Sequence, residues 1–96
     1  MNEKNLFTKK HLAIFSEASR RITELANQLP DNDVSFSIEL CTRTFAVWYE
    51  AIEWEDEAIV KSDFYCYRLD SNDDGIRLFN KITEWEKKYG LQQSDT

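Results

Sequence analysis

The side chains that could do chemistry in this 96-residue chain are one histidine, two cysteines and 18 carboxylates. His11 falls on the apolar side of a helical pattern, where a histidine is most often structural. A general base needs a nucleophile or a second acid within hydrogen-bond reach, and no motif ties a serine or cysteine to His11. We therefore expect His11 to be half-buried and structural, and we predict no catalytic residues and no enzymatic activity.

One stretch matches the first half of an EF-hand calcium loop, Asp70-x-Asn72-x-Asp74-Gly75. The match then fails, because Lys81 stands at the twelfth position, where a bidentate glutamate is required. We instead expect these residues to start a helix, with Ser71 as the cap and Asp74 completing a capping box. The sequence predicts no metal site and no cofactor.

Cys41 and Cys66 are the two cysteines. The N-terminus has no apolar core region typical of a signal peptide, and no apolar run approaches the length of a membrane span. We therefore expect a cytoplasmic protein with free, buried thiols. A disulfide between the two is the alternative, and a zinc site is less favoured because two cysteines and one histidine give no ligand pairs at finger spacing.

A dense acidic block is the best functional clue in the sequence. Five carboxylates fall within eight residues, and three large aromatic residues accompany them: Glu50, Glu53, Glu55, Asp56 and Glu57, with Trp48, Tyr49 and Trp54. Aromatic side chains supply binding energy at protein interfaces, and charge steers the encounter. We predict a partner-binding site at these residues. The alternative is a solvated hairpin tip whose charges keep a sheet edge from aggregating.

The net charge of −6 is unevenly distributed, since residues 30–96 hold seven Lys and Arg against fifteen Asp and Glu. This excess of negative charge excludes the basic surface patch typical of a nucleic-acid-binding protein, and it disfavours binding to an anionic membrane. The expected partner is a basic protein surface, and the protein is not expected to bind nucleic acid or membrane directly.

The hydrophobic periodicity predicts the elements that position these residues. Apolar residues recur every three or four positions over about 6–29 and again up to Tyr89, which indicates two amphipathic helices. His11 and Glu86 interrupt the two apolar stripes, so we expect them to meet where the helices touch, or each to find a backbone partner. Between the helices the period changes to two, which predicts three strands at 34–41, 45–54 and 59–69.

The predicted fold is α+β, with the order helix, three-stranded antiparallel sheet, helix and with both helices on one face of the sheet. The middle strand is apolar on both alternations, as expected of a central strand. We expect one domain over residues 1–91 and a disordered tail at 92–96. The sheet face opposite the helices should then be exposed, or be covered by a second copy of the chain, and we predict self-association through it.

In size and net charge the chain is similar to small acidic inhibitors that phages encode against host nucleases, including anti-CRISPR and anti-restriction proteins, although no motif is shared. That similarity implies a non-enzymatic binding protein that acts as a nucleic-acid mimic on a basic surface of its partner. The alternatives are a structural homodimer that buries the open sheet face and, third, a small enzyme.

Overall fold

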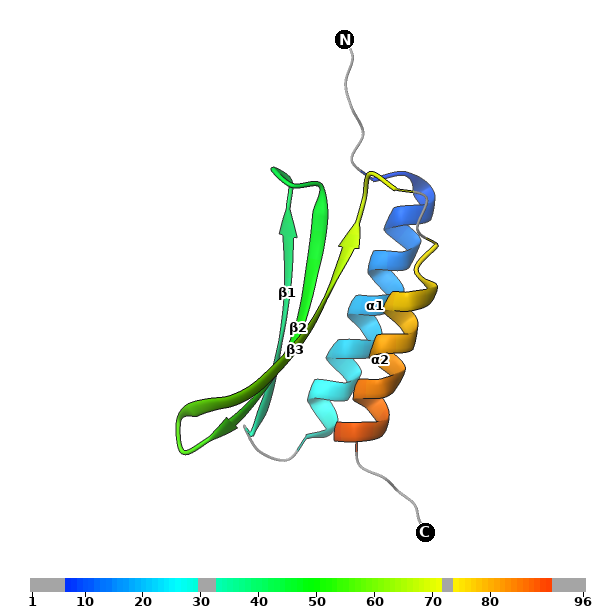
Figure 1. Ribbon diagram of the computed structural model, residues 1–96. Coiled ribbons are helices and arrows are strands. Elements are labelled where there is room, and N and C mark those ends of the chain that lie inside the picture. The colour runs from blue at the N-terminus through cyan, green and yellow to red at the C-terminus, as the bar shows by residue number, and fades with distance from the viewer. Residues whose placement is uncertain (1–6, 30–32, 72–73, 91–96) are drawn as a thin grey trace.

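The computed structural model describes residues 7–29, 33–71 and 74–90. The element order is α1 (Lys9–Gln28), β1 (Val34–Cys41), β2 (Ala46–Glu55), β3 (Ala58–Arg68) and α2 (Ile76–Tyr89). The strands form one antiparallel sheet in the order β1-β2-β3, and both helices lie on the same face of it (Figure 1). The predicted fold is confirmed, with β2 in the centre. The tail at 92–96 lies outside the described residues.

The first helix begins where its cap can satisfy a free backbone donor. Thr8 accepts a hydrogen bond from the backbone N–H of His11 at 3.1 Å. The residues that α1 buries recur at three- and four-residue steps: His11, Ile14, Ala18, Ile22 and Leu25. On the exposed side Arg20 pairs with Glu17 and with Glu24, so this charged face is a solvated surface.

The register of the sheet decides which side chains share a face. Tyr49 of β2 lies opposite Ile38 of β1 and Tyr65 of β3, and directly paired residues point to the same side. Burial shows that this side is the one under the helices, because Val47, Tyr49 and Ala51 are completely buried. The alternate residues of each strand point to the opposite side, which no described element covers (Figure 1). We call this side the outer face.

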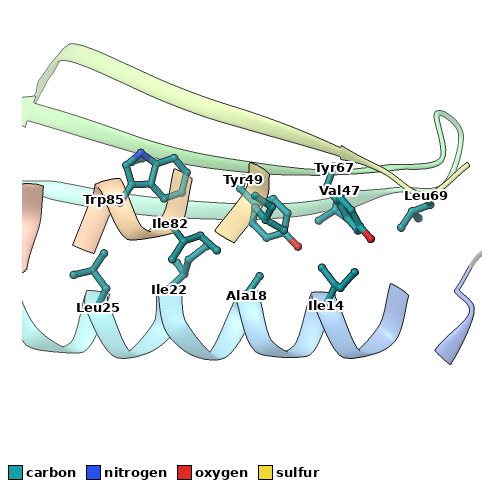
Figure 2. Packing of buried hydrophobic residues seen from close by; sticks show 12 residues of the cluster. Ile14, Ala18, Ile22, Leu25, Val47, Tyr49, Tyr67, Leu69, Ile82 and Trp85 are labelled. Carbon is teal, nitrogen blue, oxygen red and sulfur yellow. The ribbon is translucent and has the colours of Figure 1, made fainter. Parts of the chain in front are cut away.

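The core lies between the sheet and the two helices, which run side by side in the same direction (Figure 1). Ile14, Ala18, Ile22 and Leu25 point from α1 toward the sheet (Figure 2). From α2 the core receives Leu78, Ile82 and Trp85, the last being the largest fully buried side chain. Burial of this single layer is the dominant favourable term for folding.

The start of α2 differs from the prediction. The helix begins at Ile76 and its cap is Gly75, with no side-chain cap. Ser71 instead donates to the carbonyl of Arg68 at 3.3 Å, so the predicted capping box is wrong. Gly75 is required here for two reasons: its φ is 83°, in the left-handed region, and a Cβ would lie 3.0 Å from the Ile14 side chain. Helix packing therefore selects the start of α2.

His11 and Glu86 do not meet, so that prediction is wrong. His11 is buried near the start of α1, where its Nδ1 lies 3.2 Å from the Thr8 hydroxyl and its ring contacts Tyr67 edge-on. Glu86 pairs with Arg21 of α1 through two oxygens, at 3.0 Å and 2.5 Å. Each polar group thus finds a side-chain partner, and the Arg21–Glu86 pair ties the two helices together.

A second polar tie joins α2 to β3. Asp63 accepts hydrogen bonds from Trp85 Nε1 at 2.9 Å and from Lys81 Nζ at 3.1 Å. Burial by itself would raise the pKa of Asp63, but these two hydrogen bonds outweigh it and lower the pKa below the ordinary value of 3.8. Lys81 therefore has a structural role as the counter-ion of Asp63.

We expect Asp63→Asn to destabilise the fold at neutral pH by about 1 kcal/mol, an amount reduced by partial solvent screening of the pair. Because the pKa of Asp63 is lower in the folded state than in the unfolded state, its ionised form stabilises the fold when the pH is above the unfolded-state pKa. That stabilisation is lost as the pH falls through the folded-state pKa. The gap in melting temperature between the wild type and the Asp63→Asn variant should therefore be largest near pH 7 and should narrow as the pH falls below the ordinary aspartate pKa of 3.8. Circular dichroism melts across this range measure it.

Asp70→Asn is the matched control, because Asp70 pairs with Arg68 on the exposed surface. Exposed pairs contribute little to stability, so this variant should melt at nearly the same temperature as the wild type at pH 7. Equal losses at the two positions would contradict the assignment of a special role to Asp63.

The hydroxyl of Tyr49 is buried and has no hydrogen-bond partner within the described part of the chain. Burial also raises the pKa of Tyr49, because ionisation would place a desolvated phenolate in the core. We expect Tyr49→Phe to stabilise the protein by about 1 kcal/mol, because it removes a buried polar group that forms no compensating bond. Urea denaturation provides the free energy of unfolding.

Tyr89→Phe removes the same atom in a different setting, because the Tyr89 hydroxyl donates to Glu53 Oε2 at 2.5 Å. This control should lower stability by about 1–2 kcal/mol. The Tyr49 prediction fails if both variants lose stability, since the Tyr49 hydroxyl would then have a partner in solution.

Candidate protein-binding face

The alternation of β2 divides the acidic block between the two faces of the sheet. Glu50 lies on the outer face, whereas Glu53 lies on the helix side. There Glu53 accepts the hydrogen bond of Tyr89 and pairs with Lys88 Nζ at 3.2 Å. The hydrogen bond from Tyr89 is the main cause of a lowered pKa at Glu53. Glu53 therefore ties β2 to the end of α2, whereas the sequence had predicted that it belongs to an open acidic surface.

The aromatic residues of the predicted site are divided in the same way. Tyr49 is completely buried beneath the helices, so the prediction that it contacts a partner is wrong. Trp48 lies on the outer face and keeps 39% of its surface exposed. Trp54 lies on that face too, where its Nε1 donates to the Ser35 hydroxyl at 2.8 Å. That bond to β1 fixes the orientation of the indole ring.

The remaining carboxylates of the block lie at the β2–β3 hairpin, which curls away from the helices (Figure 1). Glu55, Asp56 and Glu57 are all exposed. Asp56 and Glu57 form the two-residue connection, with φ values of 55° and 70°. Between this hairpin and the start of β1 is a hollow of about 540 Å³, lined by Asp33, Val34, Ser35, Trp54, Asp56 and Glu57. Glu55, Asp56 and Glu57 thus form an acidic projection at one end of the outer face.

At the centre of the outer face, two residues outside the predicted site, Phe64 and Glu39, join Trp48 and Glu50. Phe64 of β3 stacks on Trp48, with ring centroids 5.6 Å apart and planes at 30°. Phe64 is 55% exposed, so the stacked pair presents apolar surface to solvent. Glu39 of β1 lies directly opposite Trp48, and Glu50 lies directly opposite Phe64. Only the strand register reveals these neighbours, since the four residues come from three strands.

These side chains form a second hollow of about 330 Å³, lined by Glu39, Cys41, Trp48, Glu50 and Phe64. Within the described residues, neither Glu39 nor Glu50 is within ion-pair distance of a lysine or arginine. The outer face therefore combines exposed aromatic surface with carboxylates that pair with no cation of the described residues. Toward the hairpin it continues into exposed Ile59, paired with Trp54.

The two cysteines are free, as predicted, but both are half-buried rather than buried. Cys41 lies in β1 and Cys66 in β3, with the central strand between them. Strands two places apart are roughly 9–10 Å apart, beyond the span of a disulfide. Hydrogen bonds from Thr44 lower the pKa of the Cys41 thiol, whereas burial raises the pKa of Cys66.

The described part of the chain contains no metal site built from these side chains. No group of three or more His, Cys, Asp or Glu side chains there could hold a metal ion. Asp70 is occupied by the guanidinium of Arg68, and Asn72 lies outside the described residues. Neither described helix has the length and apolar character needed to cross a membrane.

Comparison with known proteins identifies no relative: no protein-family model, no curated protein and no solved structure matches the chain.

Proposed function

We propose that this protein is a non-enzymatic binding module that uses the outer face of its sheet and the acidic β2–β3 hairpin to bind a basic surface of another protein. One observation carries the proposal. The only sheet face that the described helices leave open exposes stacked aromatic rings beside carboxylates without a cation.

The physical basis is the combination of two properties on one surface. Exposed aromatic residues contribute contact area that drives association once water is excluded. Trp48 and Phe64 supply that area at the centre of the face. Carboxylates around them attract a positively charged partner and disfavour a negatively charged one. A surface of this kind is suited to a basic protein patch.

The finer proposal concerns the identity of that patch. A basic protein surface that normally holds nucleic acid carries Lys and Arg placed to meet phosphates. The net charge of −6 and the exposed carboxylates on the outer face and hairpin allow this chain to occupy such a surface as a mimic. The role would then be that of a phage-type inhibitor of a nuclease, of the anti-CRISPR or anti-restriction kind.

Affinity capture with wild-type and altered baits tests the proposal. The altered bait carries Glu50→Gln, Glu55→Gln and Glu57→Gln, which remove three outward carboxylates. A specific partner should be captured by wild type at low salt, be lost at high salt, and be at least roughly tenfold less enriched on the altered bait. With the purified partner, the association rate should fall most.

Glu53→Gln is the control, since Glu53 belongs to the same stretch of sequence but is held by Tyr89 and Lys88 on the helix side. It should reduce stability and leave partner binding unchanged. The proposal is wrong if the partner binds the triple variant as tightly as wild type. The hairpin would then be a charged tip that only protects a sheet edge.

A structural homodimer is the second candidate, because the exposed Trp48–Phe64 stack is also a surface that a second copy could bury. An apolar contact of that kind should give twice the monomer mass at any salt concentration. The binding module should be monomeric or weakly dimeric, because two acidic faces repel each other. Sedimentation equilibrium at low and high salt distinguishes the two.

A further inference from the structure

The hollow at the centre of the outer face has the chemistry of a site for one particular side chain. The stacked rings of Trp48 and Phe64 form an apolar surface, and Glu39 and Glu50 border it from neighbouring strands. We propose that this hollow binds an arginine side chain of the partner, with the guanidinium against the Trp48 indole and its N–H groups donating to Glu39 and Glu50. The inference rests on the proposed function and names the anchor of the partner.

The first support is the unbalanced charge. On the outer face Glu39 and Glu50 occupy diagonal positions of neighbouring strands, because Glu39 pairs with Trp48 and Ser37 pairs with Glu50. Like charges this close on one sheet face repel each other. Other carboxylates of the fold, such as Glu86 and Asp63, have an arginine or lysine partner within the described residues. Glu39 and Glu50 are left for a cation from outside the described chain.

The second support is the exposed aromatic pair. A cation over the face of an indole is attracted by the electrons of the ring, and tryptophan is the strongest of the aromatic residues in this interaction. A guanidinium also stacks on rings as a flat group and is weakly hydrated, whereas an ammonium is compact and strongly hydrated. The hollow of about 330 Å³ is large enough to admit a side chain. These properties favour arginine above lysine.

The test uses two synthetic peptides, Ac-(Gly-Arg)₃-NH₂ and Ac-(Gly-Lys)₃-NH₂, titrated into the ¹⁵N-labelled protein. Binding is followed through the indole N–H resonances of Trp48, Trp54 and Trp85 in heteronuclear NMR spectra. We expect the arginine peptide to shift the Trp48 resonance and to bind roughly tenfold more tightly than the lysine peptide. Trp85 is buried in the core and should not respond.

The double variant Glu39→Gln/Glu50→Gln should weaken binding of the arginine peptide by about tenfold or more, since it removes both charge-assisted contacts. Its matched control is Glu55→Gln/Glu57→Gln, which removes the same charge from the hairpin and should change the affinity by less than about threefold. Unchanged amide spectra elsewhere show that each variant is folded.

The outcomes separate this inference from the proposed function. Equal shifts with both peptides at Trp48 would overturn the arginine site and leave a basic partner in place. Shifts confined to Trp54 and the hairpin would also overturn it, and would move the contact to the acidic projection. If neither peptide shifts the Trp48 resonance, the arginine site is also overturned. Affinity capture with the wild-type and altered baits then tests separately whether the protein binds a basic partner. Concentration-dependent broadening of Trp48 without peptide would overturn it too, because a second copy would then cover the face.

Discussion

Trp85→Ala will cost the folded state about 3–5 kcal/mol, the largest effect that we expect from any single substitution in this chain. Trp85 is 1% exposed and is the largest fully buried side chain, so its removal leaves a cavity between α2 and the sheet. It also deprives Asp63 of a hydrogen bond. Domains of this size are stable by only about 5–15 kcal/mol, so the variant should be close to unfolding at physiological temperature. Urea titration followed by circular dichroism measures the loss.

The same substitution at Trp48 is the control, because Trp48 lies on the outer face with 39% of its surface exposed. Trp48→Ala should lose only its stacking with Phe64, about 1 kcal/mol, while partner binding should weaken strongly. Comparable losses of stability at the two positions would show that the outer face is buried in solution. That result would favour the homodimer.

Replacing the hairpin connection Asp56-Glu57 by Asn-Gly will raise the midpoint of thermal and urea unfolding. Both residues have positive φ, at 55° and 70°. Aspartate tolerates the left-handed region, as asparagine does, so the strain falls chiefly on Glu57. Two-residue hairpins of this geometry favour Asn followed by Gly, because these residues enter the left-handed region at low cost. Relief of the strain, chiefly at position 57, should therefore contribute about 1–2 kcal/mol to the free energy of unfolding.

The control for this prediction is Asp56→Asn/Glu57→Gln, which removes the same two charges and keeps a side chain at both positions. It should gain much less than the Asn-Gly variant. Equal gains would show that charge repulsion, and not backbone strain, limits the stability of the hairpin.

The types of the secondary-structure elements and their order along the chain could be predicted from local patterns in the sequence. The three- to four-residue period over α1 and α2 and the two-residue period between them follow from the geometry of helix and strand. At the start of α1 the cap is also local, because Thr8 accepts its hydrogen bond from the residue three positions on. The order β1-β2-β3 is the simplest that short connections allow, and the structure adopts it.

The sequence also predicted an acidic, aromatic binding site, but the structure brings only part of its residues to one surface. Trp48, Trp54 and Glu50 lie on the outer face, together with the exposed hairpin. The alternation of β2 already separates Tyr49 and Glu53 from them. Which of the two faces is covered depends on where the helices pack, and the middle strand is apolar on both sides. The burial of Tyr49 therefore depends on tertiary packing and could not be predicted from the strand pattern.

The contacts between distant segments could not be predicted from such local patterns. Strand register brings Phe64 and Glu39 beside Trp48, and no local pattern in the sequence predicts that neighbourhood. Helix packing directs Arg21 to Glu86 and requires glycine at position 75. Local propensity acts over a few residues, whereas these contacts join segments far apart along the chain, so they form only when the whole core is packed.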